Sequence, residues 1–222
     1  MPENPKIISY NTIRRSVGVL GISLPVIISA GAYILGNCNE IQSSVSLYYN
    51  TIMRNVFVGI LCAVALFMFA YRGYDYRDRI AGISAFVFAL GIAFFPASKD
   101  MVINCKYDIP QLRHPGWIRT IHLTSATLFF LTLSYFSLCL FTRTDGKPGS
   151  YTKQKKKRNV LYRICGFVML MSIFIIALWM LVLESKFPHL EQYHPVFWLE
   201  SIALWAFGIS WLVKGEVVLK DK

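Results

Sequence analysis

A long apolar run, NVLYRICGFVMLMSIFIIALWMLVL at residues 159–183, decides the fold. Its one charged residue, Arg163, lies close to its beginning. About 20 consecutive apolar residues are enough for a helix to cross the roughly 30 Å hydrocarbon core of a bilayer. We therefore interpret this run as a transmembrane helix.

The same pattern recurs along the chain, and it predicts an all-α integral membrane bundle of six transmembrane helices. The chain is 55% hydrophobic and only 16% charged, whereas soluble proteins carry about 25% charged residues. A soluble all-helical protein of this size could not bury six fully apolar helices. Only short loops remain between the runs, so residues 1–222 are expected to form a single transmembrane domain. The predicted spans are 16–36, 52–71, 80–97, 118–142, 159–183 and 195–213.

The first of these runs has a basic flank, as a secretory signal peptide does. Its apolar stretch of about 20 residues is longer than the 7–15 residues of a signal's apolar region. We therefore interpret it as an uncleaved first helix.

The basic residues predict the orientation of this bundle. Of the 23 Lys and Arg residues, 17 fall on the side that holds both termini, and six fall on the other. Short cytoplasmic loops carry an excess of Lys and Arg. Both termini are therefore expected in the cytoplasm, with the protein in the plasma membrane or a bacterial inner membrane. We interpret the basic segment 153–158 as part of this topology signal, beside anionic headgroups, and we expect no nucleic-acid partner.

Two of the five cysteines lie in loops that we place outside. Cys38 falls between the first two predicted spans, and Cys105 falls between the third and fourth. An exterior compartment permits disulfides. We therefore predict a Cys38–Cys105 bridge, which would connect the ends of the first and third spans.

Four polar residues lie at or near the predicted spans at a similar depth, close to the outer surface. They are Arg54, Asp100, His122 and Glu200. Ionisable residues inside membrane spans are costly and usually face the bundle interior or a water-filled cavity. We expect them to form an outward-facing ligand-binding pocket or, alternatively, an Arg54–Glu200 ion pair that locks two helices with His122 beside it. A third possibility is that Arg54 extends alone to the surface.

A metal site is a weaker alternative for the same region. His122, Glu200 and Asp100, with His114 or His194, would supply enough ligands for zinc. No pair of them has a ligand spacing such as HxxxH on one helix. The chain also lacks a Walker loop, a dinucleotide fingerprint, HExxH and GxSxG, so we assign neither a metal nor a cofactor.

Part of the sequence resembles known membrane families. The segment 79–96, followed by Asp100, His114 and His122, resembles a bacterial six-span membrane-protein family of unknown function. The segment 119–130, with Tyr135 and Glu200, is similar to the FRAG/DRAM/Sfk group. Members of that group are six-span proteins linked to lipid-anchor remodelling, autophagy regulation and plasma-membrane lipid organisation.

The resemblance implies a fold and a connection with lipid, but it supplies no reaction. That group tends to carry Ser-x-Thr-Gly and Pro-Glu in its first outer loop, whereas residues 43–54 here read SSVSLYYNTIMR. We therefore do not assign the ligand of that group to this chain.

These observations leave three functions open. The first is a multi-pass membrane protein that binds or organises lipid through an outer-leaflet-facing polar pocket. The second is a membrane-embedded hydrolase, with or without a metal, that uses His122 and Glu200. The third is a structural or regulatory subunit without a site. The sequence assigns neither an enzymatic activity nor a protein partner.

Overall fold

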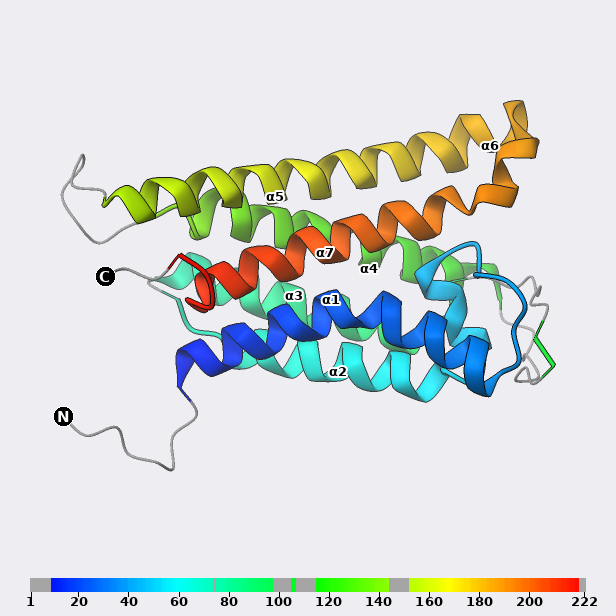
Figure 1. Cartoon of the computed structure of the whole chain (residues 1–222), viewed down its shortest axis with the longest axis horizontal. Helices are drawn as coiled ribbons and strands as arrows, with labels where there is room; N and C mark the ends of the chain where they lie inside the picture. The colour runs from blue at the N-terminus through cyan, green and yellow to red at the C-terminus, as the bar shows by residue number, and fades with distance from the viewer. Residues whose placement is uncertain (1–8, 74, 98–104, 107–114, 144–151, 220–222) are drawn as a thin grey trace.

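The computed structural model describes residues 9–73, 75–97, 105–106, 115–143 and 152–219. Within these residues the fold is all-helical, as predicted, and β pairing is limited to one isolated bridge between Cys38 and Cys105. Six helical rods run along the long axis of the molecule (Figure 1). They correspond in order to the six apolar runs of the sequence.

The rods consist of long helices, two of which continue into π-helical segments. Their bounds are α1 Tyr10–Leu35, α2 Arg54–Ala70, α3 Tyr76–Phe94, α4 Gly116–Tyr135 with η2 Phe136–Leu140, α5 Lys153–Leu178 with η3 Trp179–Leu183 and α6 Glu184–Lys186, and α7 Pro195–Lys214. Two short 3₁₀ helices, η1 Val45–Asn50 and η4 Pro188–Tyr193, lie in connections between rods.

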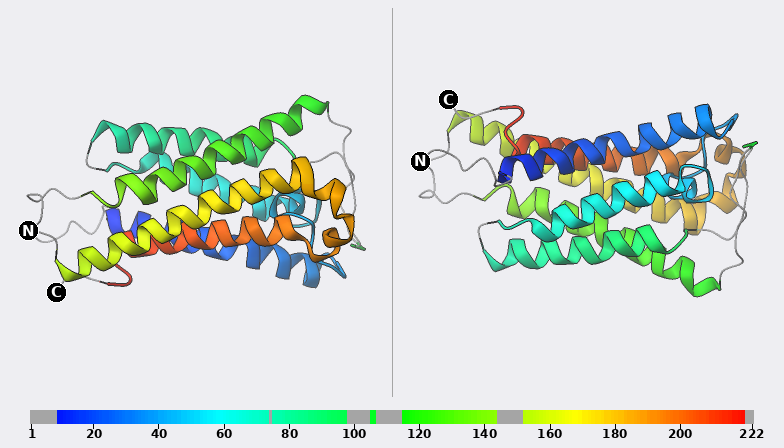
Figure 2. Two further views of the ribbon diagram at one scale, coloured as in Figure 1. Left: turned by 90° about the horizontal axis from the view of Figure 1, so that it is seen from above. Right: turned by 90° about the horizontal axis from the view of Figure 1, so that it is seen from below.

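The rods form a closed ring. Each packs against the next along the chain, and α7 closes the ring by packing against α1 as well as α5. The views from above and below show the same helices running side by side along the bundle (Figure 2). We call the end that holds η1 and the start of α7 the η1 end, and the other the Arg143 end.

The contact between α1 and α7 depends on glycine. A Cβ atom at Gly18 would lie 2.8 Å from the backbone oxygen of Gly208. A Cβ atom at Gly208 would lie 2.6 Å from the oxygen of Gly18. Small residues of this kind let helix backbones approach closely, as they do in membrane bundles. This contact fixes the closure of the ring.

Local sequence signals begin several of the helices. The Ser9 hydroxyl accepts a hydrogen bond from the Thr12 N–H, and the Thr152 hydroxyl accepts one from the Lys155 N–H. Such caps satisfy backbone donors that have no partner inside the helix. Pro195 occupies the first position of α7, where its missing N–H costs nothing.

Four of the rods in the described residues are long and apolar enough to cross a membrane: Tyr10–Leu35, Gly116–Leu140, Lys153–Lys186 and Pro195–Lys214. Helix α2 is apolar but has only 17 residues. Helix α3 begins with the charged turn formed by Arg77, Asp78 and Arg79, which shortens its apolar part. The four long helices indicate a membrane protein.

The surface of the bundle agrees with this indication. Many large apolar side chains point outward from the middle of the rods, including Val19, Val26, Leu66, Val87, Phe167, Met171 and Phe174. Soluble monomers rarely expose contiguous apolar surface on this scale. By contrast, several polar side chains, among them Ser134, Ser137, Ser172 and Ser210, are buried between helices.

Candidate functional site

The 3₁₀ helix η1 lies across one end of the bundle and organises the polar residues there (Figure 1). The Ser44 hydroxyl caps η1 by accepting a hydrogen bond from the Leu47 N–H. The Phe197 N–H in α7 donates to the Ser43 carbonyl at 3.0 Å. The segment 43–50 is therefore the one against which these polar side chains lie.

Glu200 holds the beginning of η1. Its carboxylate oxygen Oε2 accepts a hydrogen bond of 2.6 Å from the Val45 backbone N–H. The first N–H groups of a helix have no partner within it and carry a partial positive charge. A carboxylate at this position both pairs the donor and stabilises the helix terminus.

His122 holds the next residue of η1. Its Nδ1 lies 2.7 Å from the Phe95 carbonyl oxygen, and its Nε2 lies 3.1 Å from the Ser46 hydroxyl. A carbonyl can only accept, so Nδ1 carries the proton. In the neutral ring Nε2 then accepts from the Ser46 hydroxyl. His122 is buried, and it links α4, the end of α3 and η1.

Arg54 contacts the other end of η1. Its Nε donates a hydrogen bond of 2.7 Å to the Tyr49 carbonyl, and its guanidinium lies 4.7 Å from the centre of the Tyr49 ring. Among the residues that the structure describes, Arg54 forms no ion pair, and Glu200 is bonded to Val45 instead. The predicted Arg54–Glu200 lock is therefore absent from this structure. The reason is that η1 lies between the two side chains and binds each of them.

The remaining predicted ligands divide into two groups. Asp100 and His114 lie outside the described residues. His194 precedes α7 with a left-handed backbone, φ 50°, and its Nδ1 is buried without a hydrogen-bond partner in the described residues. No three His, Cys, Asp or Glu side chains in the described segments lie close enough together to hold a metal ion.

The two predicted disulfide partners lie together at the same end. The sulfur atoms of Cys38 and Cys105 are at disulfide-bonding distance, with Cα atoms 3.8 Å apart. The backbone N–H of Lys106 also bonds to the Asn37 carbonyl. The pair connects the segment after α1 to the segment between α3 and α4.

Sequence reasoning missed Ser46, which the structure places against His122. Its only sequence signal was position: a serine in the stretch 43–46, two residues before the aromatic pair Tyr48–Tyr49. A polar residue in a connection is ordinarily assigned to solvent, and only the tertiary fold shows that this one is buried.

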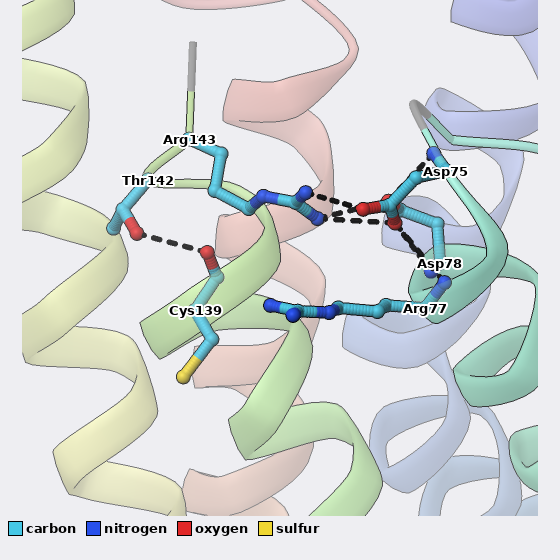
Figure 3. A network of polar contacts seen from close by, with 6 residues as sticks. All are labelled: Asp75, Arg77, Asp78, Cys139, Thr142 and Arg143. Atoms are coloured by element: carbon cyan, nitrogen blue, oxygen red, sulfur yellow. Dashed lines mark hydrogen bonds and ion pairs between the residues drawn. The ribbon is translucent and has the colours of Figure 1, made fainter. Parts of the chain in front are cut away.

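A second polar network, at the Arg143 end, was also missed (Figure 3). Arg143 follows η2 and points across to Asp75 and Asp78, with which it forms ion pairs. Asp75 caps α3 in a capping box with Asp78, a signal that the spacing Asp-x-x-Asp could have given. Hydrogen bonding to the Arg143 guanidinium holds the pKa of the Asp75 carboxyl well below its ordinary value. This network connects the α2–α3 turn to the end of the fourth rod.

Comparisons of the chain with protein-family models, curated proteins and solved structures find no match.

Proposed function

We propose that this chain is a six-span membrane protein that binds or organises lipid through a polar site facing the outer leaflet. Both termini are cytoplasmic in this proposal, and the η1 end faces outward from a plasma or bacterial inner membrane. The asymmetry of 17 to six basic residues supports this orientation. The likeness of 119–130 to the FRAG/DRAM/Sfk group supports a role with lipid.

Two further arguments support membrane spans for α2 and α3. Helix α2 has 17 residues, the lower limit for a span. Helix α3 has 19 residues, and its charged first turn falls at the predicted cytoplasmic surface, where long basic side chains reach the headgroups. Because the rods form one closed ring, α2 and α3 share the surroundings of the four longer helices.

The observation that carries the proposed function is the arrangement of Arg54. Tyr49 engages its Nε and one face of its guanidinium. Its two terminal nitrogens have no partner among the described residues. A guanidinium presents donors in a planar fork that matches the oxygens of a phosphate. At the depth of the outer headgroups, Arg54 is therefore suited to bind a lipid phosphate.

His122 and Glu200 have a supporting role in this proposal. Each holds η1 by one hydrogen bond, at Ser46 and Val45. Since Tyr49 belongs to η1, these bonds fix the residue that orients Arg54. A binding group that is held in place before the ligand arrives loses less entropy on binding.

Native mass spectrometry of the purified protein tests the proposal by counting the phospholipid molecules that remain bound. Arg54→Gln removes the charge and keeps a polar side chain. A lost charge-assisted hydrogen bond of about 1.5–3 kcal/mol corresponds to roughly 10–150-fold weaker binding. We therefore expect most of the phosphate-bearing lipid at this site to be lost.

Arg119→Gln is the matched control, because Arg119 is exposed at the same end of the bundle on α4. We expect it to leave the bound lipid unchanged. Equal retention of lipid by wild type, Arg54→Gln and Arg119→Gln would contradict the proposal and favour a purely structural role for these polar residues.

One observation favours a hydrolase as a second candidate. Ser46 and His122 have the geometry of a nucleophile and its base, since Nε2 faces the hydroxyl and the Phe95 carbonyl orients Nδ1. In a lipid-ester hydrolase Ser46 would attack the ester carbonyl and His122 would take its proton. His122 would then pass that proton to the leaving alcohol, and water would release the acyl group.

A fluorophosphonate probe separates this candidate from lipid binding alone, because it labels activated serines. Labelling of the wild type that is lost in Ser46→Ala would support the hydrolase. No labelling of the folded wild type would leave the Ser46–His122 pair as a structural bond.

A further inference from the structure

A groove of about 700 Å³ lies along the outer face of α5 where this helix meets α7. Its floor consists of α5 residues at helical spacing, and Leu199 and Ile202, from the first two turns of α7, form a wall at the end of the groove farther from Arg163. The groove is almost entirely apolar, and Arg163 is its one charged lining residue. Its lining residues do not include η1, Arg54, His122 or Glu200.

The position of Arg163 makes this groove more than an uncovered apolar face. Arg163 is exposed near the Arg143 end of α5, and it makes no hydrogen bond or ion pair within the described residues. Val160, Ile164 and Phe167 around it are also exposed. A cation without a partner in the described part of the chain therefore lies at one end of an apolar groove on the outer surface of the bundle.

The length of the groove agrees with the dimensions of one leaflet. From Arg163 to Ile175 the helix rises about 18 Å, at roughly 1.5 Å per residue. Half of the roughly 30 Å hydrocarbon core is about 15 Å. An acyl chain that starts at the level of Arg163 would therefore reach approximately to the bilayer midplane along this floor.

The charge along α5 defines the kind of lipid. Lys156 is exposed and lies seven residues before Arg163, on the same face of the helix and about 10 Å nearer the basic end. A phosphate at Arg163 would thus have a second cation on its headgroup side. Anionic lipids are attracted to basic residues of this kind beside membrane helices.

We propose that the groove between α5 and α7 binds one anionic phospholipid of the leaflet at the Arg143 end. Arg163 binds the phosphate, and an acyl chain lies along α5 between Ile164 and Ile175. In the orientation proposed above this is the cytoplasmic leaflet. The site is independent of Arg54, and its occupant enters from the opposite leaflet.

The test uses the full chain in nanodiscs that contain zwitterionic phosphatidylcholine with or without anionic phosphatidylglycerol. Native mass spectrometry after release measures the ratio of phosphatidylglycerol to phosphatidylcholine that remains bound. Arg163→Gln is expected to lower this ratio about fivefold, the effect of losing one basic residue that contacts the bound anionic headgroup. Arg79→Gln, at an exposed position on α3 near the same end, is expected to leave it unchanged.

A second variant tests the groove apart from the charge. Ile202→Trp keeps Arg163 but fills the space beside α7, so it is expected to lower retention of phosphatidylglycerol as well. Met171→Trp, at another exposed position of the lining, replaces it if Ile202→Trp does not fold. Normal retention by a folded groove-filling variant would overturn the proposal, because general attraction to Arg163 would then suffice.

Two other results bear on the site. Equal losses in Arg163→Gln and Arg79→Gln would also overturn it, as would a wild type that shows no preference for phosphatidylglycerol. Arg163→Gln is expected to lower this ratio by the same factor in the Arg54→Gln background as in the wild type, so failure of one lipid site is distinguishable from failure of the other.

Discussion

The carboxylate of Glu200 accepts a hydrogen bond of 2.6 Å from the backbone N–H of Val45. A side chain of α7 thereby holds the short helix that follows α1, across more than 150 positions of sequence. Val45 and Ser46 are both buried. The Glu200–Val45 bond connects η1 to α7, the closing helix of the ring, and the Ser46–His122 bond connects η1 to α4.

The first prediction concerns this bond. Glu200→Ala leaves the Val45 N–H without its partner, and loss of a hydrogen bond to a charged group costs about 1.5–3 kcal/mol. We expect a lower free energy of unfolding by that amount in detergent, measured by denaturant titration. Glu200→Gln keeps an oxygen acceptor and should cost less. Identical stability of the wild type and Glu200→Ala would show that Glu200 does not hold η1.

A double-mutant cycle on Ser46 and His122 gives the second prediction. Ser46→Ala leaves the buried Nε2 of His122 unpaired, at a cost of about 1–3 kcal/mol. His122→Phe removes the ring nitrogens altogether. We expect the combined loss to be smaller than the sum of the single losses by at least about 0.5 kcal/mol, as for residues in contact. A strictly additive result in the same unfolding assay would mean that the two side chains do not interact.

The third prediction concerns the Cys38–Cys105 pair, which encloses a sequence separation of 67 residues. A disulfide closing a loop of this size typically contributes about 2–4 kcal/mol. Replacing both cysteines by serine is expected to lower the thermal unfolding midpoint. Alkylation of the unfolded chain should modify Cys62, Cys139 and Cys165 before reduction, and all five cysteines after it. Five modified cysteines without reduction would contradict the bridge.

Acid should weaken the Asp75–Arg143 ion pair, which gives the fourth prediction. The pKa of Asp75 in the folded protein lies below its ordinary value, so the pair stabilises the protein above about pH 4. Its contribution is lost as the pH falls toward the folded pKa. The gap in unfolding midpoint between wild type and Arg143→Gln should be largest near neutral pH and shrink below about pH 4. A gap that persists unchanged in acid would exclude the ion pair as its cause.

The sequence predicted the helical class, the order of the six rods and the proximity of Cys38 and Cys105. These features follow from long-range apolar patterning and from the assignment of both cysteines to one end. The predicted runs 16–36 and 195–213 differ from α1 Tyr10–Leu35 and α7 Pro195–Lys214 mainly at the ends. There, polar turns continue a helix beyond its apolar part.

The partners of the polar residues could not be predicted in the same way. Depth along a helix can be read from sequence, and the structure places both His122 and Glu200 against η1. The rotation of each helix and the course of residues 43–53 cannot be read from it. That course places η1 between Arg54 and Glu200, so each side chain bonds to backbone or ring atoms of η1 instead of to the other.

The central claim is that the bundle spans the membrane with η1 outside. The most direct test measures the accessibility of single cysteines at the two ends of the continuous helical rod Lys153–Lys186. Cys62, Cys139 and Cys165 would first be replaced by serine. Single Lys153→Cys and Lys186→Cys variants would then be treated on intact cells with a membrane-impermeant maleimide. We expect labelling at position 186 and none at position 153 until the cells are permeabilised. Labelling of 153 alone would reverse the orientation, and labelling of both on intact cells would contradict a membrane span.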